Sequence, residues 1–82
     1  MAEYRKKPVV IEAFRFPAEK WPEWFWNAIN AGIVTLNEGD GAWIHTLEGK
    51  LGIANNAYVI RGIKGELYAC DPEIFAETYE AV

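Results

Sequence analysis

Hydrophobic residues between positions 21 and 32 follow the repeat of a helix. They recur three or four positions apart, at Trp21, Trp24, Phe25, Ala28 and Ile29. This spacing places them on one face of an α-helix, with Trp26 outside that face. Pro22 suits the first helical turn, and Gly32 suits the position just after the last one. We therefore predict one amphipathic helix that packs its apolar face on a core.

Outside this segment, short apolar runs alternate with turn residues, a pattern typical of antiparallel strands. The runs that we interpret as strands cover residues 9–16, 33–36, 42–47, 51–54, 58–61, 67–70 and 78–82. Glycines, asparagines and acidic residues separate them. Asn55 and Asn56 form one such turn, because asparagine tolerates a left-handed backbone. Asp71 followed by Pro72 predicts the cap and first position of a helical turn.

These elements predict an α+β fold, with residues 1–82 forming a single small domain. The expected architecture is a curled antiparallel β-sheet of five to six short strands with one amphipathic helix packed on it. Residues 9–16 carry apolar side chains at both odd and even positions, including Val9, Val10 and Ile11. A strand of this kind is covered on both faces or lies at a contact between subunits.

Charge and composition exclude several classes of function. The formal net charge is −4, distributed as +2 over residues 1–20 and −6 over the remainder. An acidic body argues against binding of a nucleic-acid polymer, which needs a contiguous basic face. Cys70 is the only cysteine and His45 the only histidine, so neither an internal disulfide nor a protein-only metal site is expected. No apolar run approaches the roughly 20 residues of a membrane span. We therefore predict a protein of a reducing compartment, without a membrane segment or a cofactor.

The residues that catalysis needs are sparse. The chain has no serine, and nothing near His45 in the sequence suggests a catalytic triad. Cys70 follows two apolar residues, which indicates a buried and inert thiol. Asp71 is better explained as a helix cap than as a general acid. We therefore expect no enzymatic activity, and we assign no catalytic or metal-binding residue.

A glycine-containing turn between residues 61 and 66 offers a candidate binding site. Arg61 and Lys64 flank its glycines, and cationic side chains together with backbone amides could hold an anion such as phosphate. The same segment is also explained as a plain hairpin turn. Aromatic side chains outside the helical face could stack on a base or pack on a partner. The candidate ligand-binding residues are Arg61, Lys64, Tyr58, Trp43, His45 and Trp26.

Four segments of the chain resemble a family of small proteins of tailed bacteriophages and prophages. They are residues 4–13, which read YRKKPVVIEA, and residues 46–49, 58–66 and 71–80. Members of that family carry Pro-Gly-Asp where this chain has residues 55–57 (Asn-Asn-Ala), and Tyr-Pro-Cys where it has residues 68–70 (Tyr-Ala-Cys). The resemblance implies a phage accessory protein in the host cytoplasm and leaves its activity open.

Three kinds of function fit these observations. The first is a homo-oligomeric binding module that sequesters a small anionic, nucleotide-type host defence signal. Its pocket is expected between subunits, because a chain this short has little room for a ligand pocket of about 300–1,000 Å³. The second is a protein-interaction inhibitor of a host defence enzyme or complex. The third is a minor structural or packaging accessory protein.

Overall fold

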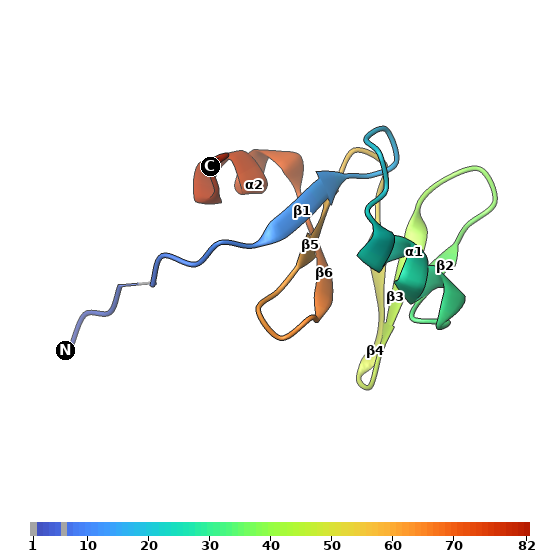
Figure 1. Ribbon diagram of the computed structural model, residues 1–82, viewed down its shortest axis with the longest axis horizontal. Coiled ribbons are helices and arrows are strands. Elements are labelled where there is room, and N and C mark those ends of the chain that lie inside the picture. Colours follow the sequence, from blue (N-terminus) through green and yellow to red (C-terminus); the bar gives the residue numbers. More distant parts are fainter. Residues whose placement is uncertain (1, 6) are drawn as a thin grey trace.

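Six antiparallel strands form two three-stranded sheets in the computed structural model (Figure 1), which describes residues 2–5 and 7–82. In chain order the elements are β1 (Glu12–Arg15), α1 (Glu23–Asn30), β2 (Val34–Leu36), β3 (Ala42–Thr46), β4 (Gly49–Ile53), β5 (Tyr58–Arg61), β6 (Leu67–Cys70) and α2 (Pro72–Thr78). The strand orders are β1–β5–β6 and β2–β3–β4. The predicted small α+β fold is confirmed, with its strands divided between two sheets and with a second helix.

The helix expected from the apolar repeat is α1, and it ends as predicted. Gly32 has a left-handed φ of 81°, and its amide donates to the carbonyl of Ile29 at 3.1 Å. The amide of Ile33 donates to the carbonyl of Ala28 at 2.9 Å. These two bonds form the Schellman motif that satisfies the last carbonyls of a helix. The helix begins at Glu23, two residues later than the apolar repeat.

An aromatic cluster joins α1 to the two sheets. Phe25 of α1 is fully buried, and its ring meets Phe14 of β1 at 4.8 Å in an edge-to-face arrangement. Trp21 and Trp24 pack around the same core. The other buried side chains come from both sheets, and they include Val34, Ala42, Ile44, Ile53 and Val59. The two sheets therefore share one core instead of burying one each.

The C-terminal segment differs from the prediction. The strand expected at residues 78–82 is wrong, because α2 continues through Thr78 and the chain after it forms no strand. Asp71 caps this helix, as predicted, by accepting the amide of Glu73 at 2.9 Å. Pro72 occupies the first turn, and no glycine or proline follows to end the helix early.

The first strand is shorter than its apolar run. Only residues 12–15 of the predicted segment 9–16 form β1, which pairs with β5 in antiparallel register. The described residues before β1, 2–5 and 7–11, leave the body of the molecule as an N-terminal arm (Figure 1). Val9 and Val10 on this arm are 44% and 76% exposed. These side chains therefore have little contact within the chain, although their sequence is typical of a strand.

Candidate functional site

An open groove of about 780 Å³ lies at the surface between α1 and the β5–β6 hairpin. We call it the α1–β6 groove. Its lining is mainly apolar: Trp24 and Ala28 belong to α1, Ala31 and Ile33 to the segment after it, Ile44 to β3, Leu47 to the turn after β3, and Leu67 to β6. Polar side chains at its rim include Asn27, His45, Arg61 and Glu66. A concave surface of ligand size thus exists within one chain, without a second subunit.

A carboxylate that contacts two lining residues connects the helix to the sheet. Glu12 accepts a hydrogen bond from the indole nitrogen of Trp24 at 3.1 Å through one oxygen. Its other oxygen lies 3.3 Å from Nη1 of Arg61. Both charged side chains are about half exposed, so this ion pair contributes little to stability. Its main effect is to orient Trp24 and Arg61 side by side at the groove.

His45 lies on β3 at the edge of the groove, and its side chain is on the face of the sheet that carries Thr35 and Trp43, opposite to the buried Ile44. Its Nε2 lies 2.7 Å from the hydroxyl of Thr35 on β2, within hydrogen-bond distance. Its backbone amide donates to the carbonyl of Ile33 at 2.7 Å. The ring is exposed at the surface but is held by these two neighbours. Two of the six predicted site residues, Arg61 and His45, therefore line the same groove.

The glycine-containing turn is occupied by a carboxylate of the chain itself. Glu66 accepts the amide of Lys64 at 3.2 Å, and its side chain lies where a Cβ on Gly62 would be. The amides of Gly62 and Gly65 donate to backbone carbonyls of the same turn, at 2.8 and 3.0 Å. An external phosphate at this turn would have to displace the carboxylate of Glu66.

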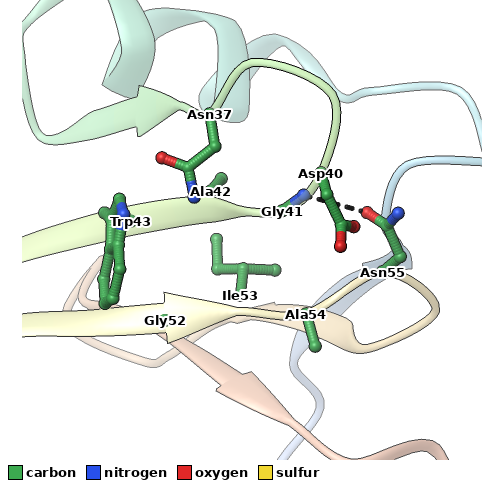
Figure 2. Close-up of a pocket in the computed structure, with 9 residues that line it drawn as sticks. All are labelled: Asn37, Asp40, Gly41, Ala42, Trp43, Gly52, Ile53, Ala54 and Asn55. Atoms are coloured by element: carbon green, nitrogen blue, oxygen red, sulfur yellow. Dashed lines mark hydrogen bonds between the residues drawn. The ribbon is translucent and has the colours of Figure 1, made fainter.

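The second hollow, of about 630 Å³, lies over β3 and β4 (Figure 2). Trp43 forms one wall, and Asp40 and Asn55 lie at the opposite end. The Oδ1 atom of Asn55 accepts the amide of Gly41 at 3.1 Å. The ammonium group of Lys50 lies 4.6 Å from the centre of the Trp43 ring. Trp43 therefore lines a different hollow from Arg61, although both were predicted to bind a ligand.

The remaining two predicted aromatic residues pack within the chain. The ring of Tyr58 stacks on Phe75 of α2, with 3.9 Å between ring centres and 5° between planes. Trp26 is half exposed, and its ring lies 4.9 Å from that of Trp21. Neither residue lines one of the two hollows. The six predicted residues thus form no single cluster.

The sequence analysis missed Trp24, which lines the groove, and Glu12, which contacts two of its lining residues. Trp24 was assigned to the core because of its helical spacing, but it is only half-buried and turns its indole nitrogen toward Glu12. Glu12 itself was passed over, although a carboxylate inside an otherwise apolar strand is a signal of a polar contact. Only the fold shows that the partner of this carboxylate is Arg61, 49 positions away.

Residues considered for catalysis and metal binding lie apart. Cys70 is half-buried, not buried as expected, because β6 is the outer strand of its sheet. Within residues 2–5 and 7–82, no three side chains of the metal-ligating types gather into a possible metal site. The described helices are also too short or too polar to cross a membrane.

The chain matches no protein-family model, no curated protein and no solved structure.

Proposed function

We propose that this chain is a non-enzymatic binding module and that the α1–β6 groove takes a small anionic ligand of the nucleotide type. The observation that carries the proposal is that the fold brings Trp24 and Arg61, which both contact Glu12, to one largely apolar groove. Its volume of about 780 Å³ lies within the range of small-molecule sites. An aromatic wall suits a flat base, and a guanidinium suits a phosphate group.

The ion pair at the rim leaves Arg61 able to bind. Glu12 contacts the guanidinium through Nη1 alone, and a guanidinium carries five N–H donors in a planar fork. The other nitrogens can therefore donate to a phosphate without loss of the contact to Glu12.

The resemblance to small phage proteins suggests a setting for this activity. A phage accessory protein that binds a nucleotide signal of host defence would act by sequestration in the host cytoplasm. Such a role requires tight binding without turnover, which agrees with the scarcity of catalytic groups in the sequence.

Binding of defined nucleotides tests the proposal. The probes are a cyclic dinucleotide and ADP-ribose, with adenosine as the uncharged comparison, measured by calorimetry on the full chain. We expect Arg61→Gln to weaken binding of the charged probes by about 10- to 100-fold, the loss of one charged hydrogen bond. Lys20→Gln, which removes a cation outside the groove, is the matched control. Equal affinities of the two variants, or no binding of either charged probe, would count against the proposal.

A second candidate function is inhibition of a host protein by direct contact. Leu47 and Ile63 lie in the turns of the β3–β4 and β5–β6 hairpins, and both are among the most exposed apolar side chains. The tips of these hairpins point in the same direction (Figure 1). Exposed apolar side chains beside an apolar groove are typical of protein-interaction surfaces.

Charge substitution at the hairpin tips separates the two candidates. Leu47→Asp combined with Ile63→Asp should abolish the capture of a specific host protein. Because Leu47 also lines the α1–β6 groove, nucleotide binding is measured with Ile63→Asp alone, which should weaken capture and leave nucleotide binding unchanged. Val82→Asp, at an equally exposed apolar residue far from the groove, is the control. If the control and the double variant capture the host protein equally well, this result would argue against contact through the hairpin tips.

A further inference from the structure

The outer edge of β1 has backbone groups that point away from its sheet. β1 lies at the end of the order β1–β5–β6. The amide of Phe16 donates to Ala57 at 2.9 Å, and its carbonyl accepts the amide of Asn56 at 2.7 Å. Both backbone groups of residue 16 therefore face the β5 side. Because this direction alternates along an antiparallel strand, Ile11 and Ala13 turn their amides and carbonyls outward.

One end of this edge is closed by the chain itself. The amide of Arg15 donates to the carboxylate of Glu19 at 2.7 Å, and the carbonyl of Arg15 accepts the amide of Glu19 at 3.1 Å. No hydrogen bond within the described part of the chain reaches the outward groups of Ile11 and Ala13. The open part of the edge is therefore the part that continues into the N-terminal arm.

The arm extends this edge with exposed, strand-forming side chains. Val9 and Val10 are exposed by 44% and 76%, and the arm leaves the body of the molecule (Figure 1). β-branched residues favour strands because they pack well on a pleated surface, and here that surface has no cover. Pro8 does not block pairing, because an even-numbered residue directs its nitrogen away from the open edge.

We propose that the open edge pairs with the same edge of a second copy of this chain. Residues 7–13 of the two copies would run antiparallel about a twofold axis, so that each Ile11 and Ala13 gains partners. A strand that offers both donors and acceptors is complementary to its own copy, as a twofold contact requires. The two sheets would join as β6–β5–β1–β1–β5–β6. This proposal does not depend on the ligand of the α1–β6 groove.

The charge distribution favours a second copy as the occupant. Residues 1–7 carry a net charge of +2, which leaves −6 on the remaining residues. When two edges pair antiparallel, the arm of each copy passes along the body of the other. A cationic arm is attracted to an acidic body, and this attraction weakens as salt screens it. The dimer should therefore dissociate more readily at high salt.

Two proline variants of the full chain test the proposal. Ile11→Pro removes an amide that faces the partner, whereas Val10→Pro removes one that faces away and serves as the matched control. Light scattering over a concentration series should give twice the mass of one chain for the unchanged protein. We expect Ile11→Pro to raise the dissociation constant about tenfold or more, since each twofold dimer loses two hydrogen bonds. Val10→Pro should raise it less.

Hydrogen exchange gives an independent measure of the same contact. In the dimer, the amides of Ile11 and Ala13 should exchange at least about tenfold more slowly than at high dilution, and the amide of Ala13 should also exchange more slowly than in Ile11→Pro. Unchanged tryptophan fluorescence and melting temperature would show that each variant is folded. A monomer at every concentration, a dimer with fast exchange at both amides, or equal dissociation constants for the two proline variants would each overturn the proposal.

Discussion

Gly41 lies where the loop after β2 enters β3, and its surroundings exclude a side chain. Its φ of 72° falls in the left-handed region, and a Cβ added there would lie 2.8 Å from the backbone oxygen of Ile53. Gly39 in the same loop has a similar φ of 81° but open space around it. The two positions therefore share the backbone requirement and differ in the contact with β4.

Alanine at these two glycines should separate backbone strain from steric overlap. We expect Gly39→Ala to lower the free energy of unfolding by about 1 kcal/mol, the cost of a left-handed non-glycine residue. Gly41→Ala should cost about 2–4 kcal/mol, because the backbone of β4 must also shift. Urea denaturation measures both. Equal losses of stability in the two variants would mean that the backbone at Ile53 moves away from the new side chain at no cost in free energy.

Tyr68 of β6 should make the protein sensitive to alkaline conditions. Burial raises the pKa of Tyr68 above its usual value of 10.0, and the hydrogen bond and charge of Tyr79 act in the same direction. Because the folded pKa is the higher one, the neutral phenol stabilises the fold below about pH 10, and this contribution is lost as the pH rises through the folded pKa.

Replacing Tyr68 with phenylalanine tests this assignment. At pH 8, Tyr68→Phe should lower the free energy of unfolding by about 1 kcal/mol, because the hydrogen bond to Tyr79 is lost. Between pH 8 and pH 11, its free energy of unfolding should fall less than that of the unchanged protein. The other tyrosines are present in both proteins, so their contribution to the pH dependence cancels in this comparison. Parallel curves over this range would show that Tyr68 is not the responsible group.

The helix α2 is held at its start and along one side, not by burial. It has no buried residue, yet Asp71 caps its first turn and Phe75 stacks on Tyr58 of β5. The amide of Phe75 donates to the carbonyl of Asp71 at 2.8 Å. An isolated helix of seven residues is unstable in water, so these contacts decide whether α2 forms.

Substitution of Asp71 should therefore loosen α2 before it unfolds the core. We expect Asp71→Ala to cost about 1 kcal/mol, the usual value of a lost N-cap, and Asp71→Asn to cost much less because its amide oxygen can still accept. Hydrogen exchange at Phe75 and Tyr79 should accelerate in the alanine variant alone. Faster exchange throughout the β5–β6 hairpin would instead indicate that α2 and this sheet unfold together.

The stability of the protein rests on one shared core centred on Phe25. This ring contacts Phe14, Phe16, Trp21 and Trp24, which brings β1, the loop after it and α1 together. A domain of 82 residues has a total stability of about 4–12 kcal/mol. A single core of this size therefore has little reserve against the loss of a large side chain.

Truncation of Phe25 should remove a large part of the free energy of unfolding. Phe25→Ala is expected to cost about 3–5 kcal/mol and to leave the chain largely unfolded at 37 °C. Trp26→Ala on the next position of α1 is the control, because half of its side chain is already exposed; we expect a loss below about 1.5 kcal/mol. Circular dichroism during thermal denaturation compares them. Similar melting temperatures would mean that the core repacks around the missing ring.

The elements that depend on neighbours in the sequence were predictable. The apolar repeat and Gly32 predicted α1 and its end, and the bounds of β5 and β6 agree with the prediction. Asp71 was correctly interpreted as a cap, and Asn56 has the left-handed φ of 75° that its turn requires. Each of these features follows from contacts within a few positions along the chain.

The arrangement of these elements in space was not predictable in the same way. The division of six strands into two sheets, the α1–β6 groove and the contacts of Glu12 with Trp24 and Arg61 join residues far apart in the chain. Many pairings of short strands satisfy the same local patterns, and only the packing of one shared core selects among them. For this reason Tyr58 and Trp43, both plausible ligand contacts in the sequence, do not line the groove that contains Arg61.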